Sequence, residues 1–210
     1  MYNWHMKIIP DMKREKELWK QGKIVIGIDE AGRGAWAGPV VVAAVALPAR
    51  HKQVDGITDS KLITHARRAE LYETITDMAL DFGVGIVDHK TIDKIGILNA
   101  TKLGAKEAVA MMKTKCDYIL TDALDLRQHI DCEQEAIIKG DQKIYSISCA
   151  SIVAKVTRDN LMSALGGDYS KYYFYKHKGY GTKLHQEKIA EHGLSDIHRR
   201  SYKPIKAYLE

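Results

Sequence analysis

The segment that decides the fold is KIVIGIDEAGRGAWAGPVVVAAVAL, residues 23–47. Residues 23–29 and 40–47 are rich in apolar and β-branched side chains, which predicts two buried β-strands. The glycine-rich segment GRGAWAGP between them, residues 32–39, predicts the turn that joins the strands. We therefore expect a sheet that begins with an antiparallel pair.

Outside this segment, predicted strands and helices alternate. Further extended segments are expected at residues 82–87, 118–120 and 143–147. Helices are expected at residues 11–21, 64–80, 91–115, 150–165 and 182–192. This order predicts an α/β fold with a mixed sheet. We expect one compact unit in which residues 1–165 form the α/β domain and residues 166–210 form a basic helical extension.

Length and composition restrict the class of protein. The chain has 210 residues, of which 45% are hydrophobic and 28% are charged, which suits one folded domain and excludes a wholly disordered class. The longest uncharged run, Gly34 to Ala49, contains two prolines and is too short to cross a bilayer. The N-terminal residues carry charges where a signal peptide needs an apolar block, so we expect a cytoplasmic protein.

The spacing of the three cysteines is not typical of a disulfide framework. Cys116, Cys132 and Cys149 are scattered and contain no CxxC pair, which argues against both a disulfide scaffold and a zinc site. We expect three buried, reduced thiols.

The positive charge is concentrated near the C-terminus. Residues 1–149 carry 21 basic and 21 acidic side chains, whereas residues 150–204 carry ten basic and five acidic ones. Such an imbalance favours a polyanionic partner, because phosphate contacts use Lys and Arg. A solvated helical surface is an equally good interpretation of the charge alone.

The first candidate site is the acidic pair Asp29 and Glu30 at the end of a predicted strand. Carboxylate oxygens at a strand end can converge on a hard divalent cation such as Mg²⁺. Neighbouring side chains of a strand point to opposite faces, so a shared metal site requires the backbone to bend at Glu30. A solvated acidic turn is the alternative.

Two further acids lie in similar positions. Asp122 follows a short apolar strand, and Asp141 comes just before the extended segment predicted at 143–147. Four carboxylates at one sheet edge could hold two metal ions that hydrolyse a phosphodiester. Asp125 and Asp131 compete with Asp122, and Asp159 is the fallback for Asp141. Each acid taken singly fits an exposed surface position better than a site.

The turn Gly32-Arg33-Gly34 offers close backbone approach beside a cation. Its glycine spacing does not match the dinucleotide-binding fingerprint, and the adjacent carboxylates would repel a pyrophosphate. A backbone that approaches a ribose or phosphate is one interpretation, and a plain tight turn is the other.

Several motifs together resemble the type 2 ribonuclease H family, ribonuclease HII. They occur in the family's order over about residues 15–203: DEAGRG (29–34), AGPVVVAAV (37–45), DSK (59–61), TDA (121–123), IIKGD (137–141), ASIVAKVTRD (150–159), HKGYGTKLH (177–185) and HRRSY (198–202). The resemblance implies a ribonuclease H-like fold, a five-stranded mixed sheet flanked by helices, with a helical C-terminal extension.

The resemblance also implies an activity and its residues. It implies a metal-dependent endoribonuclease that cleaves the RNA strand of RNA/DNA hybrids and cuts 5′ of single ribonucleotides in duplex DNA, leaving 3′-hydroxyl and 5′-phosphate ends. Two Mg²⁺ or Mn²⁺ ions would be held by Asp29, Glu30, Asp122 and Asp141. Substrate would contact Gly32, Arg33, Gly34, Lys61 and Tyr180. We expect a monomer whose partners are hybrid duplexes and ribonucleotide-containing DNA.

Some residues depart from the family pattern or allow other interpretations. Ala35-Trp36 replaces the usual Pro-Leu after GRG, Ser148-Cys149 replaces Ala-Ala, and Leu62 replaces a lysine. Arg158 and Asp159 are interpreted as a local ion pair. Exposed positions in a basic patch are expected for His177, His185 and His198.

The rival functions are another nuclease on the same scaffold, a non-catalytic nucleic-acid-binding module, and a small-molecule nucleotide enzyme.

Overall fold

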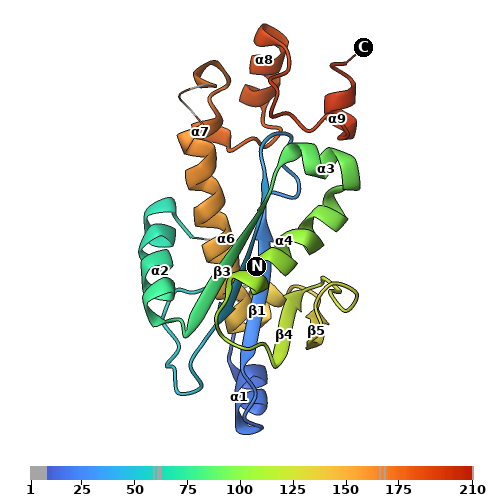
Figure 1. The fold of residues 1–210 in the computed structure, drawn as a ribbon. Helices are drawn as coiled ribbons and strands as arrows, with labels where there is room; N and C mark the ends of the chain where they lie inside the picture. Colours follow the sequence, from blue (N-terminus) through green and yellow to red (C-terminus); the bar gives the residue numbers. More distant parts are fainter. Residues whose placement is uncertain (1–8, 59, 61–62, 166, 168, 210) are drawn as a thin grey trace, which may run out of the picture.

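A five-stranded mixed sheet forms the centre of the protein (Figure 1). The structure is a computed structural model that describes residues 9–58, 60, 63–165, 167 and 169–209. The strand order is β3-β2-β1-β4-β5. The β1–β2 and β2–β3 pairs are antiparallel, and the β1–β4 and β4–β5 pairs are parallel. The strands are β1 (Val25–Ala31), β2 (Val40–Ala46), β3 (Asp81–Val87), β4 (Tyr118–Asp122) and β5 (Glu133–Ile137).

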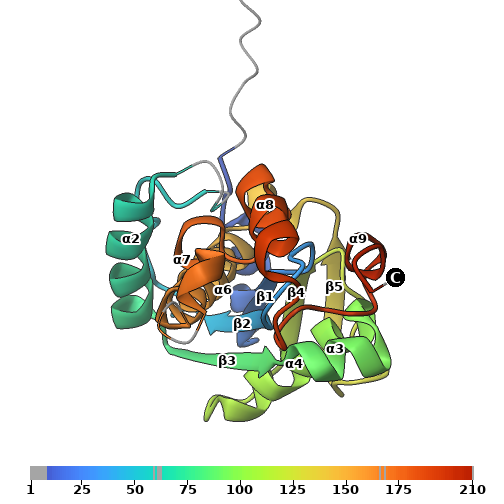
Figure 2. The ribbon, with the colours of Figure 1, turned by 90° about the horizontal axis from the view of Figure 1, so that it is seen from above.

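Helices cover both faces of the sheet, with α2 and α6 on one face and α3 and α4 on the other (Figure 2). The helices of this part of the chain are α1 (Lys13–Lys20), α2 (His65–Met78), α3 (His89–Ile95), α4 (Ile97–Met111), α5 (Gly140–Lys143) and α6 (Tyr145–Ala164). The expected α/β fold with an antiparallel start is confirmed.

Strand alternation explains why β2 is apolar at every position. Ala43 and Val45 pack into the core beneath α2 and α6, whereas Val42 and Ala44 pack into the core beneath α4. A strand buried on both faces needs apolar side chains throughout, as residues 40–46 have. The two cores therefore lock β2 and its neighbour β1 at the centre of the sheet.

The close approach of β1 to α6 depends on Gly27. A Cβ atom at Gly27 would collide with the backbone of Ser146, in the first turn of α6. Because no side chain intervenes, α6 lies directly against β1, and its next turns run past the end of that strand. This contact places α6 beside Asp29.

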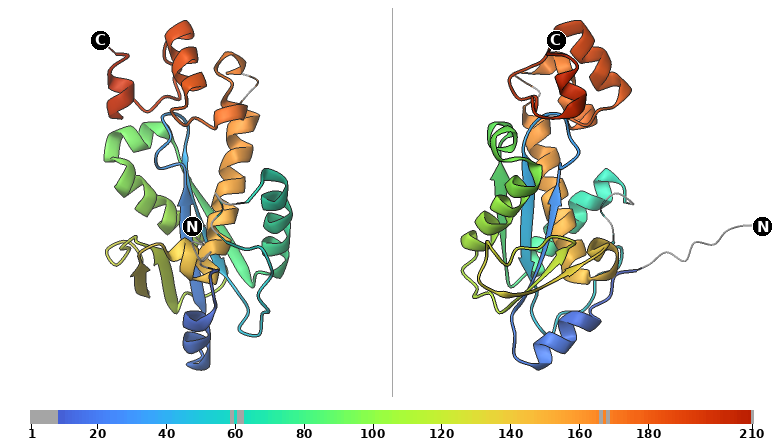
Figure 3. Two further views of the ribbon diagram at one scale, coloured as in Figure 1. Left: turned by 180° about the vertical axis from the view of Figure 1, so that it is seen from behind. Right: turned by 90° about the vertical axis from the view of Figure 1, so that its right-hand side faces the viewer.

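A helical extension covers the end of the sheet beyond the β1–β2 turn (Figures 1 and 3). It consists of the 3-10 turn η1 (Ser170–Tyr172) and the helices α7 (Phe174–His177), α8 (Lys183–His192) and α9 (Lys203–Lys206). Its core packs Phe174 and Ile197 against Ala37 of the turn and Met162 of α6. The extension is thus attached to the glycine-rich segment itself.

Two predicted elements differ from the observed ones, and one observed strand was not predicted. Of residues 143–147, only Ile144 is extended, where it bridges to Asp11, whereas Lys143 ends α5 and Tyr145 begins α6. The apolar first turns of α6 imitate a strand, because that part of the helix is buried on nearly all sides. The helix expected at 91–115 is two helices, separated at Gly96, whose φ of 79° interrupts the helical backbone. Strand β5 was not predicted, because the partly exposed sequence EQEAI carries no apolar signal.

The expectation of three reduced thiols is wrong for two of them. Cys116 and Cys132 form a disulfide, whereas Cys149 is a buried free thiol. Both paired cysteines pack against the core beneath α4. Within the described residues, no helix is long and apolar enough to span a bilayer.

Candidate active site

A cavity of about 400 Å³ lies where β1 and β4 end. The last residues paired between these parallel strands are Ile28 and Thr121, so β1 continues beyond its neighbour and leaves the sheet open on that side. The cavity gathers side chains from both strands, the glycine-rich turn, α6 and the extension. It is lined by Asp29, Glu30, Ala31, Gly32, Arg33, Gly34, Ser60, Asp122, Asp141, Ser151, Lys155 and Tyr180.

Asp29 and Glu30 both line this cavity without the bend that alternation seemed to require. Strand β1 stays regular through Ala31, and Glu30 pairs with Val42 of β2. Both side chains reach the cavity because β4 does not pair with β1 beyond Ile28, which leaves the sheet open beside Asp29 and Glu30. The expected backbone bend at Glu30 is therefore wrong.

Asp29 is buried in an acidic environment. Burial raises the pKa of Asp29 well above its usual value, and the nearby charges of Glu30 and Asp122 raise it further. Hydrogen bonds from the Ser151 hydroxyl and from the Glu30 backbone N–H, the latter 2.8 Å from Asp29 Oδ1, act in the opposite direction. A buried carboxylate surrounded by like charges is a position that a bound cation would stabilise.

Asp122 and Asp141 reach the cavity from neighbouring segments. Asp122 ends β4, and its Oδ1 accepts a hydrogen bond of 2.8 Å from the backbone N–H of Gly140. Asp141 follows in α5 and is 5% exposed. It therefore enters the site from a short helix, not from the start of a strand as the sequence suggested.

The rival acids are placed elsewhere. Asp125 is exposed and paired with Arg127 at 2.7 Å. Asp131 is exposed as well, and neither lines the cavity. The structure thus separates Asp122 from both competitors, which the sequence barely did.

The four carboxylates suit divalent cations by their donor chemistry. Asp29, Glu30, Asp122 and Asp141 supply oxygen ligands, which Mg²⁺ and Mn²⁺ favour, and Asp29, whose pKa is raised by burial and by the charge of Glu30, is a carboxylate that a bound cation would stabilise. Among the described residues, no three His, Cys, Asp or Glu side chains are already gathered around one point as ligands. The chemistry of the donor set fits a divalent cation.

The glycine-rich turn forms one wall of the cavity. Gly32 has a φ of 95°, and a Cβ atom there would collide with the Arg158 side chain, so both the backbone and the space require glycine. Arg33 is half exposed and pairs with Glu30 at 3.3 Å. Its carbonyl oxygen accepts hydrogen bonds from Arg199 and from the Tyr202 hydroxyl.

Tyr180 lines the same cavity as Gly32, Arg33 and Gly34. Two cations lie near its ring: Lys155 Nζ is 5.4 Å and the Arg158 guanidinium carbon is 5.2 Å from the ring centroid. Lys155 also lines the cavity, and the sequence analysis did not identify it. Lys155 lies four residues after Ser151, so the two side chains share one face of the helix. This spacing is the sequence signal that could have identified both residues.

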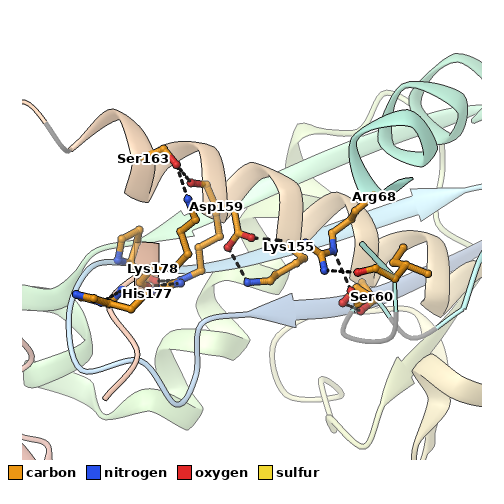
Figure 4. A network of polar contacts seen from close by, with 12 residues as sticks. Ser60, Arg68, Lys155, Asp159, Ser163, His177 and Lys178 are labelled. Carbon is orange, nitrogen blue, oxygen red and sulfur yellow. Dashed lines mark hydrogen bonds and ion pairs between the residues drawn. The ribbon is translucent and has the colours of Figure 1, made fainter. Parts of the chain in front are cut away.

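A polar network supports the segment that contains Ser60 (Figure 4). Arg68 Nε donates to the Ser60 carbonyl oxygen at 2.8 Å, and the Ser60 and Ser151 hydroxyl oxygens are 3.1 Å apart. Asp159 accepts from Lys155 Nζ at 2.6 Å and lies 3.8 Å from Arg68. Lys61, predicted to contact substrate, lies outside the described residues.

This network settles the two alternatives that involved Asp159. Its carboxylate is engaged with Lys155 and Arg68 and does not line the cavity, so it does not replace Asp141. Its interpretation as a local ion pair with Arg158 is wrong, because the Arg158 guanidinium donates to backbone carbonyl oxygens.

The histidines expected in an exposed basic patch are buried. His177, His185 and His198 are 7%, 0% and 0% exposed. His185 Nδ1 donates to the Tyr180 carbonyl, so its Nε2 accepts from His198 Nε2 at 3.0 Å. Burial lowers the pKa of His185 to about 3 and that of His198 to about 4. These neutral rings are part of the core of the extension.

Comparisons with known proteins agree on one family. The family model for ribonuclease HII matches residues 26–205. The ribonuclease HII of Dehalococcoides mccartyi strain BAV1 is 50% identical over 206 residues, which cover 97% of each chain.

Solved structures give the same result. Ribonuclease H2 from Pyrococcus horikoshii is 25% identical, with a TM-score of 0.73 over 88% of this chain and 96% of that chain. RNase HII of Archaeoglobus fulgidus, solved in a complex with PCNA, is 27% identical, with a TM-score of 0.71 over 86% of this chain and 95% of that chain. The ribonuclease H-like fold implied by the motifs is confirmed. The chain thus belongs to the ribonuclease HII family and is a hydrolase, an endoribonuclease that acts on RNA/DNA hybrids.

Proposed function

We propose that this protein cleaves the RNA strand of RNA/DNA hybrids and also cuts 5′ of a single ribonucleotide in duplex DNA, leaving 3′-hydroxyl and 5′-phosphate ends. One observation carries the proposal: a single cavity joins four carboxylates to a glycine-rich backbone and an aromatic ring. The carboxylates suit phosphodiester hydrolysis, and the glycine-rich backbone with the aromatic ring suits inspection of a sugar.

Asp29, Glu30, Asp122 and Asp141 are the proposed ligands of two Mg²⁺ or Mn²⁺ ions. When bound, such a pair of ions activates the attacking water and stabilises the leaving oxygen of a phosphodiester. The protein's own contribution is to hold the four carboxylates on rigid elements. Two of them are in β1, one ends β4 and one lies in α5.

Recognition of ribose is assigned to the turn and to Tyr180. The 2′-hydroxyl distinguishes ribose from deoxyribose and both donates and accepts hydrogen bonds. Gly32 and Gly34 both line the cavity, and the backbone at Gly34 is open, with no heavy atom within 4 Å of a Cβ position there. The Tyr180 ring can stack on the sugar or base. Lys155 adds a cation close to Tyr180, in reach of a phosphate in the same cavity.

The surroundings of the cavity suit a duplex substrate. The basic excess of residues 150–204 belongs to α6 and the extension, which carries Tyr180. Phosphate contacts of this kind set the position of a duplex without reading its bases. A cytoplasmic monomer stays a prediction.

The test is one gel series. A labelled duplex with one embedded ribonucleotide, an RNA/DNA hybrid and an all-DNA duplex are each incubated with Mg²⁺, Mn²⁺ or chelator. We expect cleavage of the first two substrates with either metal and no cleavage with chelator. Cleavage of all-DNA duplex would favour another nuclease of the same scaffold, and chelator-insensitive binding without cleavage would favour a binding module.

A further inference from the structure

Arg158 is a buried cation to which the proposed chemistry gives no role. Its side chain leaves α6 and is 0% exposed. Within the described residues, its guanidinium donates to three backbone carbonyl oxygens and to no carboxylate: Pro39 at 2.9 Å, Ala37 at 3.2 Å and Lys178 at 2.9 Å. Burial of an arginine is costly unless its donors are satisfied, so this arrangement depends on all three carbonyls.

The three carbonyls belong to two segments that each contribute residues to the cavity lining and that contact one another through the Trp36 N–H and the Gly179 carbonyl. Ala37 and Pro39 end the glycine-rich turn, whereas Lys178 begins the tight turn that presents Tyr180. The same side chain fills the space that a Cβ atom at Gly32 would need, and its guanidinium carbon lies 5.2 Å from the Tyr180 ring centroid. Arg158 therefore contacts both walls at once.

We propose that Arg158 is a positioning residue that sets the separation between the ribose-facing backbone of the glycine-rich turn and the Tyr180 ring. The planar guanidinium fork suits this task, because it donates in fixed directions to several acceptors, which a lysine ammonium cannot reproduce. A site that checks one hydroxyl group needs its two walls held in register before the substrate arrives. The inference rests on the proposed ribonucleotide site.

Arg199 provides a matched control. It is also 0% exposed, and its guanidinium donates to the carbonyl oxygens of Arg33, Gly38 and Pro39. All three acceptors lie in the glycine-rich segment, and none lies in the turn before Tyr180. Loss of either arginine should weaken the fold, but only loss of Arg158 should uncouple the two walls.

A double-mutant cycle separates these roles. Arg158→Lys and Arg199→Lys are each combined with Tyr180→Ala, and kcat/KM is measured on a duplex with one ribonucleotide. We expect Arg158→Lys to lower kcat/KM by about tenfold or more in the protein that retains Tyr180. In the Tyr180→Ala background the same substitution should lower kcat/KM by less than about threefold. Arg199→Lys should cause the same loss in both backgrounds, within about twofold. Equal losses from Arg158→Lys in both backgrounds would overturn the inference.

A second measurement does not depend on activity. The Trp36 backbone N–H donates to the Gly179 carbonyl at 2.8 Å and so reports directly on contact between the two walls. We expect Arg158→Lys to accelerate amide hydrogen exchange at Trp36 by about tenfold below the unfolding temperature, and Arg199→Lys to leave it nearly unchanged. Unchanged exchange at Trp36 in the Arg158 variant would overturn the inference.

Two outcomes of these experiments require a second variant or the exchange measurement alone. If Arg158→Lys does not fold, Arg158→Gln removes the buried charge, keeps two N–H donors and enters the same cycle and the same exchange measurement. If Tyr180→Ala alone leaves the rate unchanged, the role proposed for Tyr180 fails, and exchange at Trp36 still decides whether Arg158 joins the walls.

Discussion

The Oδ1 atom of Asp122 accepts a hydrogen bond of 2.8 Å from the backbone N–H of Gly140. This bond ties the end of β4 to the short helix that carries Asp141, one residue further along the chain. Asp122 therefore has two tasks in the proposed site. It contributes a carboxylate to the cavity, and it positions the segment that supplies another.

The first prediction separates the charge of Asp122 from its hydrogen bond. Asp122→Asn keeps an oxygen acceptor for the Gly140 N–H but removes a negative charge that the proposed cations need. We expect cleavage of a ribonucleotide-containing duplex to be abolished while duplex binding stays measurable by fluorescence anisotropy. Asp29→Asn should behave in the same way.

Asp125→Asn is the control for that prediction. Asp125 lies in the loop after β4 but is exposed and paired with Arg127. Its removal should leave cleavage within about twofold, because exposed ion pairs contribute little. Full activity in either Asp122→Asn or Asp29→Asn would refute the assignment of these acids.

The second prediction concerns Tyr180. Tyr180→Ala should lower the rate at a lone ribonucleotide by at least about tenfold, equivalent to about 1.4 kcal/mol in the activation barrier. The reason is loss of the aromatic ring that lines the cavity together with the glycine-rich turn. Single-turnover kinetics measures the effect, and Tyr208→Ala, at an exposed tyrosine outside the cavity, should have normal rates. A normal rate in Tyr180→Ala would remove this residue from the site.

The third prediction compares two glycines of one turn. Gly32→Ala places a side chain at a φ of 95° and against Arg158, and such strain costs on the order of 1–3 kcal/mol. Gly34→Ala meets open space, with no heavy atom within 4 Å. Thermal unfolding should therefore show a clear loss of stability for Gly32→Ala and little change for Gly34→Ala. Equal melting temperatures would contradict the structure of the turn.

The fourth prediction is a loss of stability at acidic pH. Burial lowers the pKa of His185 to about 3 and that of His198 to about 4, from 6.5. Because these pKa values are lowered, the unfolded chain binds protons before the folded protein does. The stability from each neutral ring is complete above about pH 6.5 and falls by up to about 1.4 kcal/mol per pH unit down to the folded pKa.

Urea unfolding from about pH 4 to about pH 8, which covers most of the interval between the folded and unfolded pKa values, measures that slope. The variant His185→Asn should show a shallower pH dependence than the parent protein, because one of the proton-linked groups is gone. His65→Asn, at an exposed histidine on α2, should keep the parental slope. Identical slopes in the parent and in His185→Asn would show that His185 is not the group responsible.

The strands at the centre of the sheet could be predicted because their signals are local. Residues 23–29 and 40–47 are apolar and β-branched, and burial on both faces demands that composition. The same reasoning failed for the first turn of α6, residues 145–147, since a helix segment buried on nearly all sides has no polar face to reveal its period. The rest of α6 was expected as a helix at residues 150–165 and is confirmed. The same reasoning also failed for β5, a polar strand at the sheet edge that is defined by its pairing with β4.

Some residues of the candidate site could likewise be predicted from the sequence, and others could not. Asp29 and Glu30 stand out because ionised carboxylates at the end of an apolar strand cost free energy where they are desolvated. Asp122 could not be separated from Asp125 by such reasoning, because both follow one strand within four residues. Lys155 and the buried histidines were missed or misplaced, because lysine and histidine suit an exposed helix as well as a cavity wall.

The sequence by itself determined the α/β class, the central strand pair, the acidic strand end and the family to which the motifs point. Only the tertiary structure decided which acids share a cavity and how its walls are joined. Arg158 is 119 residues from Pro39 and 20 residues from Lys178, yet one guanidinium bonds to both. Local composition governs strands and turns through short-range sterics and burial, whereas backbone carbonyls are identical at every residue, so only folding selects which of them a buried cation meets.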